Sequence, residues 1–182
     1  MQLITINKNI FIVENFWSKE KCEAFINKSE ILGYEAATID TEKGQRVIES
    51  VRNNNRVIYK DFELADEIWQ ELKEYAPAKI GLSIAIGLNE LFRFYKYQPG
   101  QLFKKHKDQS FVRNEVEASY FTLMIYLNDD YKGGETTFNE LTIQPKTGNA
   151  LIFLHELEHE GSAVEAGIKY VLRTDIMYKL EE

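Results

Sequence analysis

The pattern of hydrophobic and polar positions changes character about halfway along the chain. In the first half, residues 10–13 form a short apolar run that predicts a strand. Residues 19–32 have the spacing of an amphipathic helix, with Ser18 as its N-cap and Gly33 just after its end. We therefore predict an early strand that is followed by a helix.

A second helix is predicted to begin after Asp61 and to extend to about Tyr75. Its apolar residues recur at helical spacing and would form one face: Leu64, Ile68, Trp69 and Leu72. Residues 35–55 lie between the two helices and are mostly polar, with Gly44 and a run of three asparagines. This stretch predicts loops around short strands.

From Leu91 onwards the pattern becomes one of strands and turns. Five segments predict strands or hairpins: residues 91–97, 118–128, 135–145, 149–154 and 169–178. Glycine pairs and Pro-Gly steps between them are typical of tight turns. Short strands with regular turns favour a sandwich or a barrel. We predict a mainly β, α+β chain in which helices precede a jelly roll, also called a double-stranded β-helix.

The sequence contains no internal repeat, low-complexity segment or Pro/Gly/Ser linker. We therefore expect a single domain over residues 1–182. Residues 1–90 would supply the N-terminal helices and supporting strands, and residues 91–182 the jelly-roll strands with the metal site. The composition agrees, since 44% hydrophobic and 28% charged residues are ordinary for a globular chain, and 13% aromatic residues favour β structure.

Charge and cysteine content exclude some classes of function. The formal net charge is −7, which argues against duplex nucleic acid as the main partner. Cys22 is the single cysteine, so no internal disulfide is expected. The first residues lack the features of a signal peptide, and no stretch approaches the roughly 18 apolar residues of a membrane span. We expect a cytoplasmic protein without a membrane partner; no pattern predicts its oligomeric state.

The first candidate for chemistry is the sequence His106-Lys107-Asp108. Residues two apart on an extended segment point the same way, so this imidazole and this carboxylate can converge on one metal ion. A second histidine from a distant strand would complete a set of two histidines and one carboxylate, which leaves positions open on iron(II). Taken alone, a histidine and an aspartate at this spacing occur most often by chance.

The second candidate is the segment from His155 to His159, which matches the H-E-x-x-H zinc motif. That motif requires a helix, whereas residues 149–154 resemble a strand and Gly161 follows soon after. A zinc metallohydrolase is therefore the less favoured interpretation. In the other interpretation only one of the two histidines binds metal.

Three segments together resemble the 2-oxoglutarate- and iron(II)-dependent oxygenases of the prolyl 4-hydroxylase type. They are YQPGQLFKKHKD, FTLMIYLNDDYKGGETTF and TGNALIFLHELEHEGSAVEAGIKYVLRTDIMY, in the order that the family shows. The resemblance covers about residues 91–178. It implies that His106, Asp108 and His159 bind iron, and it leaves His155 with a structural role.

The resemblance also implies a co-substrate site. It places Lys169 at the distal carboxylate of 2-oxoglutarate, where a buried anion requires a cation. Arg173 lies on the same strand face by even spacing and is the alternative anchor. Tyr97 is expected to form a hydrogen bond to the co-substrate, and Thr136 is expected to line the pocket near iron. The implied cofactors are Fe(II), 2-oxoglutarate and O2, with ascorbate as an optional reductant.

The implied reaction is hydroxylation of a substrate C–H bond, with succinate and CO2 as co-products. A peptidyl proline or a free amino acid is the first expectation for the protein, peptide or small-molecule substrate. Residues 35–55 and 109–117 would flank the mouth of the pocket. Arg52, Asn53 and Arg56 are candidates for substrate contact, although such residues are more commonly solvated loop charges. A catalytically inactive jelly-roll binding module is the other alternative, and the complete triad and Lys169 count against it.

Overall fold

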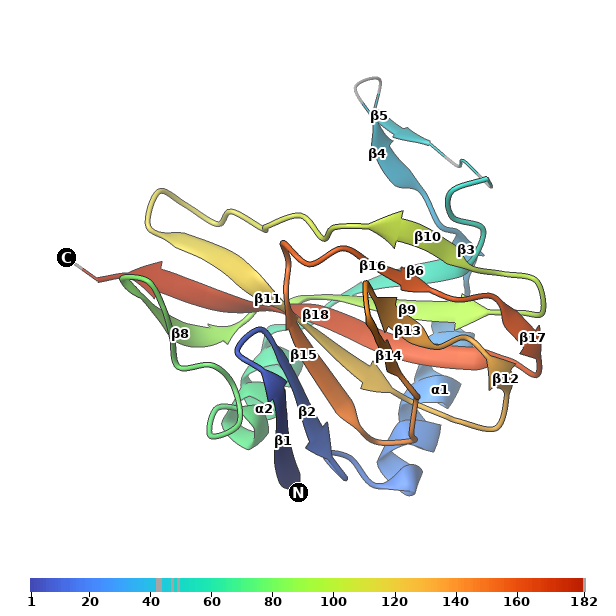
Figure 1. Ribbon diagram of the computed structural model, residues 1–182, viewed down its shortest axis with the longest axis horizontal. Coiled ribbons are helices and arrows are strands. Elements are labelled where there is room, and N and C mark those ends of the chain that lie inside the picture. Colours follow the sequence, from blue (N-terminus) through green and yellow to red (C-terminus); the bar gives the residue numbers. More distant parts are fainter. Residues whose placement is uncertain (42–43, 47, 49, 182) are drawn as a thin grey trace.

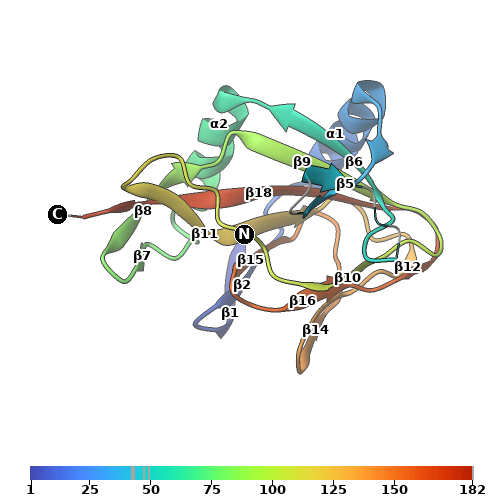
Figure 2. The ribbon, with the colours of Figure 1, turned by 90° about the horizontal axis from the view of Figure 1, so that it is seen from above.

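The computed structural model describes residues 1–41, 44–46, 48 and 50–181. Three layers make up the fold: helices on one face of a large sheet, and a small sheet against its other face (Figures 1 and 2). This arrangement confirms the predicted jelly roll with few helices. In the described part of the chain, no helix is long and apolar enough to cross a membrane.

The large sheet has ten strands. Eight follow the order β1-β2-β15-β11-β18-β9-β6-β3, while β8 pairs with β18 and β7 pairs with β8. The strands are β1 (Gln2–Asn7), β2 (Ile10–Glu14), β3 (Glu35–Ala36), β6 (Asn55–Lys60), β7 (Lys79–Ile80), β8 (Ser83–Leu88), β9 (Leu91–Tyr97), β11 (Glu117–Tyr126), β15 (Ala150–Leu154) and β18 (Lys169–Leu180).

The small sheet has the order β10-β16-β13-β14 and closes the roll. Its strands are β10 (Phe103–His106), β16 (His159–Gly161), β13 (Thr136–Phe138) and β14 (Leu141–Ile143). Two short ribbons complete the described strands: β12 (Lys132–Gly133) with β17 (Val164–Ala166), and β4 (Ile39–Thr41) with β5 (Gly44–Arg46). The predicted hairpin within residues 135–145 is formed by β13 and β14.

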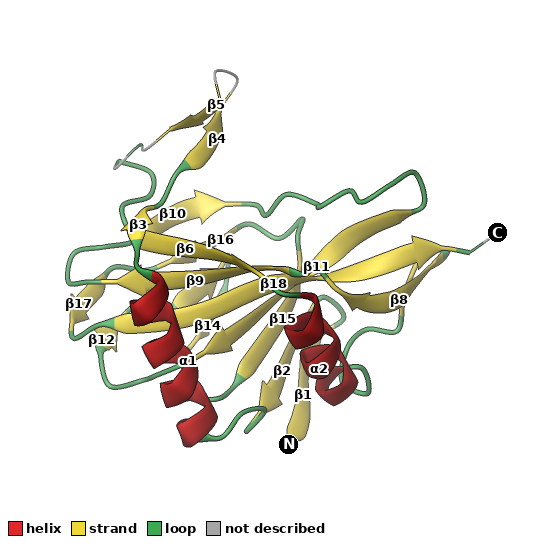
Figure 3. Ribbon diagram, turned by 180° about the vertical axis from the view of Figure 1, so that it is seen from behind, coloured by secondary structure: helices red, strands yellow, loops and turns green. Residues whose placement is uncertain are grey.

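Both helices pack side by side on the outer face of the large sheet (Figure 3). Helix α1 (Lys19–Leu32) begins where the Ser18 hydroxyl accepts a hydrogen bond from the Lys21 N–H, as predicted. Helix α2 (Phe62–Leu72) begins where the Asp61 carboxylate accepts one from the Leu64 N–H. It ends three residues before the expected Tyr75, and the following Pro77 disfavours helical backbone in the residue that precedes it.

Strand β11 shows why the central strands are apolar along their whole length. Leu123 and Ile125 belong to the core beneath the helices, whereas Met124 and Tyr126 belong to the core between the two sheets. Successive side chains of a strand point to opposite faces, and here both faces are covered. The inner core is rich in aromatic residues, and the candidate site lies at its edge.

Several strands were not predicted. Strand β1 was not predicted because it lies at the end of the sheet and is largely exposed. Strand β8 was not predicted because its residues are mostly half-buried and show no clear alternation. Strand β16 was not predicted because it has only three residues and contains a glycine. It nevertheless pairs with both β10 and β13, so the most informative strand for the site is one that sequence periodicity cannot detect.

Gly148 connects the turn before β15 to the segment that precedes helix α1. Its N–H donates to the Tyr126 carbonyl at 2.8 Å, and its own carbonyl accepts from the Trp17 N–H at 2.9 Å. Its φ is +78°, and a Cβ atom at this position would collide with the Trp17 backbone carbonyl. Glycine is therefore required both for conformation and for space.

We predict that Gly148→Ala lowers the free energy of unfolding by at least about 3 kcal/mol, because strain and a backbone clash act together. Gly81→Ala is the matched control, since Gly81 has a φ of +56° but nothing within 4 Å of the added methyl group. It should cost about 1 kcal/mol. Urea denaturation measures both, and equal losses would contradict the role given to the Trp17 contact.

Candidate metal centre and cofactor pocket

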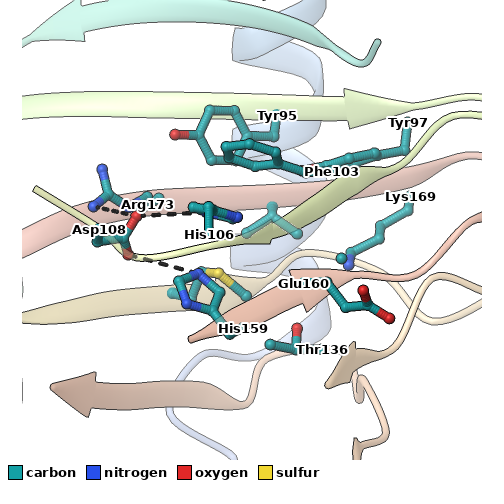
Figure 4. Close-up of a pocket in the computed structure, with 13 residues that line it drawn as sticks. Tyr95, Tyr97, Phe103, His106, Asp108, Thr136, His159, Glu160, Lys169 and Arg173 are labelled. Carbon is teal, nitrogen blue, oxygen red and sulfur yellow. Dashed lines mark ion pairs between the residues drawn. The ribbon is translucent and has the colours of Figure 1, made fainter. Parts of the chain in front are cut away.

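Strand pairing in the small sheet brings the two histidines of the predicted triad together. His106 is the last residue of β10, His159 is the first residue of β16, and the two are directly paired across the ladder. Asp108 follows two residues after His106, just beyond the end of the strand. Figure 4 shows the three side chains pointing toward one another.

Both imidazoles are oriented by backbone carbonyl groups. His106 Nδ1 lies 2.7 Å from the Lys104 carbonyl oxygen, and His159 Nδ1 lies 3.0 Å from the Leu157 carbonyl oxygen. A carbonyl only accepts, so each Nδ1 carries the proton and each Nε2 is left with a free lone pair. This is the usual way in which proteins aim histidine at a metal ion.

The two free Nε2 atoms face the Asp108 carboxylate. His106 Nε2 lies 3.8 Å from Asp108 Oδ1, and His159 Nε2 lies 3.8 Å from Asp108 Oδ2. One ligand atom from each of the three residues lies within 4.8 Å of the others. Two neutral nitrogens and one carboxylate oxygen suit iron(II) and leave coordination positions for small ligands. The donor set therefore fits the metal that the sequence predicted.

The electrostatics keep these ligands ready to bind metal. Burial lowers the pKa of His106 to about 4, and the nearby His159 lowers it further against the opposing effect of Asp108. Burial also lowers the pKa of His159. Both imidazoles are consequently neutral at neutral pH, which is the form that coordinates a metal ion.

Asp108 is an anion in a buried position, and Arg173 compensates its charge. The Arg173 guanidinium lies 3.2 Å from Asp108 Oδ1 and 3.0 Å from Asp175 Oδ1. Burial alone would raise the pKa of Asp108, but Arg173, His159 and a hydrogen bond from Thr122 hold it well below its usual range. Asp108 is therefore ionised and fixed in place before a metal ion arrives.

A chain of hydrogen bonds reaches Asp108 from the far side. Thr122 Oγ1 lies 2.5 Å from Asp108 Oδ2 and 3.0 Å from His155 Nδ1, while Ser119 Oγ lies 2.9 Å from His155 Nε2. Thr122 has one proton and gives it to the carboxylate, so His155 Nδ1–H donates to Thr122, and Ser119 donates to His155 Nε2. His155 thus supports the metal site and has no free nitrogen for a metal ion.

The zinc-hydrolase motif does not form in this structure. His155 lies in a turn after β15 and His159 begins β16, so the segment between them is not the helix that the motif requires. His159 faces Asp108 and His106, whereas His155 supports Asp108 through Thr122. This agrees with the interpretation in which only one of the two histidines binds metal.

A pocket extends from the triad into the roll. Lys169 lies at its inner end, 3% exposed, and donates a hydrogen bond to the Gly134 carbonyl at 2.6 Å. Its Nζ is 5.2 Å from the centre of the Tyr97 ring, and these two residues are paired across β9 and β18. Burial lowers the pKa of Lys169 to about 8, and Glu135 acts in the opposite direction.

The other predicted pocket residues line the same space. Thr136 is buried and shares a hydrogen bond of 2.7 Å with the Tyr126 hydroxyl. Arg173 also faces the pocket, as its even spacing from Lys169 suggested, but its guanidinium is already paired with Asp108 and Asp175. Arg173 therefore orients a candidate metal ligand, whereas Lys169 offers its charge to the pocket.

An open cleft joins the site from the outer side. Arg52 and Arg56 line it and are 5% and 9% exposed, so the expectation that they are solvated loop charges was wrong. Arg56 belongs to strand β6, not to a loop. Asn53 has a structural task, because its side-chain oxygen accepts a hydrogen bond from the Leu102 N–H at 2.8 Å.

Sequence reasoning missed the residues that support the triad. Ser119, Thr122 and Asp175 are polar residues inside otherwise apolar strands, and all three are buried. A polar side chain at a strand position that should face the core is a signal of this kind of support. Tyr95 and Phe103 also line the site, but nothing in their sequence context separates them from ordinary core aromatics.

Comparison with known proteins agrees with the fold. Residues 92–174 match the sequence family described as the 2OG-Fe(II) oxygenase superfamily. Prolyl 4-hydroxylase 1 of Arabidopsis thaliana is 23% identical over 176 residues, which cover 84% of this chain and 59% of the plant protein. The chain thus spans about three fifths of the length of that relative.

Solved structures share the fold at low sequence identity. A viral collagen prolyl hydroxylase from Paramecium Bursaria Chlorella virus-1, in its 2OG complex, has a TM-score of 0.66 and 20% identity, with 96% of this chain and 98% of that chain covered. A Trichoplax adhaerens prolyl hydroxylase in complex with a hypoxia inducible factor peptide fragment has a TM-score of 0.70 and 16% identity, with 96% and 84% covered.

Two histidines and one carboxylate that leave coordination positions open are typical of non-haem iron(II) oxygenases. Over residues 92–174 the chain is similar to the 2OG-Fe(II) oxygenase superfamily, and the relatives that it resembles include prolyl 4-hydroxylases. The cofactors of this superfamily are Fe(II) and 2-oxoglutarate, used with O2, and the donor set and the buried Lys169 fit them.

We predict that Thr122→Val weakens metal binding by about 10- to 100-fold, since it removes the hydroxyl that orients Asp108. Titration of the apoprotein with Fe(II) or Mn(II) measures the effect. Thr142→Val is the matched control, because Thr142 is exposed on β14, and it should bind metal normally. Unchanged affinity in Thr122→Val would contradict the supporting role of the hydrogen-bond chain.

Proposed function

We propose that the protein is a 2-oxoglutarate- and Fe(II)-dependent dioxygenase that hydroxylates a substrate C–H bond, with succinate and CO2 as co-products. The observation that carries this proposal is the joint arrangement of the triad and Lys169 around one pocket. The triad presents the donors that iron requires, and Lys169 presents a buried cation at the other end.

Lys169 supports 2-oxoglutarate as the pocket's occupant. Among the described residues, no carboxylate lies within ion-pair distance of its Nζ, and the group donates only to a backbone carbonyl. A buried ammonium without an anionic partner is costly, and the distal carboxylate of 2-oxoglutarate would supply that partner. Tyr97 lies against the same ammonium group, so its hydroxyl is a candidate hydrogen-bond donor to the same carboxylate.

The protein's own residues would bind, orient and protect the reactants. Bound iron supplies the oxygen activation that couples decarboxylation of 2-oxoglutarate to hydroxylation. Arg173 and Thr122 keep Asp108 ionised and oriented, and aromatic walls such as Tyr95, Phe103 and Tyr97 exclude water. No side chain has to act as an acid or a base on the substrate carbon.

The first expectation for the substrate is a peptidyl proline, with a free amino acid as the second. The similarity to prolyl 4-hydroxylases supports proline as the residue that is hydroxylated. The similar structure from Trichoplax adhaerens is in complex with a peptide, which supports a peptide substrate. The open cleft beside the triad provides the space through which such a substrate would approach.

The proposal is tested by oxygen-dependent succinate formation from 2-oxoglutarate, with Fe(II) and a panel of proline peptides and free amino acids. We expect one substrate to raise succinate formation and to gain one hydroxyl group by mass spectrometry. His159→Ala should abolish both. Peptide cleavage that depends on zinc and is lost in His155→Gln would instead support a hydrolase, and substrate binding without any succinate would support an inactive binding module.

We predict that Lys169→Ala raises the KM for 2-oxoglutarate by about 10- to 100-fold, the loss expected for a charge-assisted hydrogen bond. Its Fe(II) affinity should be unchanged. Arg173→Ala should weaken Fe(II) binding more than it raises this KM, because it removes the ion pair that holds Asp108 in place. Lys179→Ala removes an exposed charge from the same strand and serves as the control. Equal effects of Lys169→Ala and Arg173→Ala on this KM would mean that the anchor is shared or wrongly assigned.

A further inference from the structure

An arginine-rich cleft lies on the open side of the triad, opposite the pocket that ends at Lys169. The cleft and the pocket share residues at the triad, namely Tyr95, Phe103, His106, Asp108 and Arg173. Beyond these, the cleft is lined mainly by positive groups: Arg52, Arg56, Arg93 and Lys107. A substrate in the cleft would therefore meet cations and the metal ligands at once.

Arg52 is buried without a carboxylate partner in the described part of the chain. Its Nε donates to the Asn54 side-chain oxygen at 2.6 Å, and its buried Nη2 has no hydrogen-bond partner. The guanidinium lies over the rings of Tyr95 and Phe103, 4.5 Å and 4.3 Å from their centres. Phe103 in turn stacks on His106 with ring centres 3.5 Å apart, so Arg52 is one aromatic ring away from a metal ligand.

Arg56 repeats this arrangement from strand β6. One of its terminal nitrogens donates to the Thr38 hydroxyl at 2.9 Å, and its buried Nε has no hydrogen-bond partner. It is paired across the sheet with Tyr95, which brings it to the same wall of the cleft as Arg52. Burial lowers the pKa of Arg56, and the like charges of Arg52 and Arg93 lower it further against the opposing effects of Tyr95 and Glu35.

The cleft has more positive charge than its surroundings neutralise. Arg93 and Arg173 are paired with Asp175, and Arg173 also with Asp108, whereas no described carboxylate lies within ion-pair distance of Arg52 or Arg56. The pKa of Tyr95 reflects the same excess of positive charge. Burial raises its pKa, but Arg52, Arg173 and Arg93 together bring it below its ordinary value. This concentration of positive charge is notable in a chain whose net charge is −7.

Two buried guanidinium groups with unused donors are costly unless an anion binds them. The planar fork of arginine matches the two oxygens of a carboxylate. The co-substrate does not meet this need, because Lys169 and the metal would engage its carboxylates in the other pocket. The unused N–H groups of Arg52 and Arg56 are therefore left for the substrate that is to be hydroxylated.

We propose that Arg52 and Arg56 form a carboxylate subsite, so that the substrate is an anion whose carboxylate lies close to the reacting carbon. The inference rests on the proposed function and narrows its substrate class. A free or terminal α-carboxylate and an acidic side chain of a peptide are the two sources of this group. The orientation follows directly: the carboxylate binds at Arg52 and Arg56, and the C–H bond points toward His106 and Asp108.

The test uses pairs of probes that differ only in this charge. N-acetyl-L-proline and N-acetyl-L-prolinamide test an α-carboxylate. The peptides N-acetyl-Gly-Pro-Glu-Gly-amide and N-acetyl-Gly-Pro-Gln-Gly-amide test an acidic side chain. Calorimetric titration of the full chain, loaded anaerobically with Fe(II) and 2-oxoglutarate, measures each affinity. We expect the charged member of one pair to bind about tenfold or more tightly than its neutral partner.

Variants of the full chain link this preference to the cleft. Arg56→Gln should abolish the preference, Arg56→Lys should keep part of it, and Lys146→Gln, which removes an exposed charge elsewhere, should leave it intact. Retained 2-oxoglutarate binding shows that each variant is folded. Equal affinity for charged and neutral probes in the wild-type protein, or no binding of any probe, overturns the proposal. Failure of the wild-type protein to bind 2-oxoglutarate contradicts the proposed function instead.

Discussion

The ion pair between Asp108 and Arg173 is the interaction on which the site depends. The jelly roll buries a carboxylate at its open end, and a buried carboxylate is stable only if its charge is compensated. Arg173 provides that compensation from the central strand β18, and Thr122 provides a hydrogen bond from the neighbouring strand β11. Because both partners lie on strands covered on both faces, the ligand has little freedom to move.

This arrangement also divides the site into two regions with different tasks. On the inner side Lys169 lies in the pocket proposed for 2-oxoglutarate. On the outer side Arg52 and Arg56 line a cleft that opens to solvent. Both regions have cations that the described protein residues leave without a carboxylate partner. The candidate metal ligands lie between them, so two anions bound at these cations would both lie close to a metal ion held by the triad.

The sequence predicted the candidate metal ligands and Lys169 better than it predicted the residues that hold them in position. The strand before the Pro-Gly turn, the triad and Lys169 are visible because each has a local pattern or a family motif. Strand β16 is too short to show periodicity, and the pairing of His106 with His159 depends on it. The task of Arg173 depends on a contact between residues far apart in the chain. Burial of Arg52 and Arg56 likewise follows from tertiary packing, so spacing alone could not distinguish them from solvated charges.

The most direct test of this account is the anaerobic visible spectrum of the protein with Fe(II) and 2-oxoglutarate. Chelation of iron by 2-oxoglutarate at the triad predicts a weak charge-transfer band that requires both ligands. The band should be lost in His106→Ala and in His159→Ala, and it should persist in His155→Gln. If His155→Gln loses the band while His106→Ala keeps it, the metal is bound by a different set of residues and the assignment of the site is wrong.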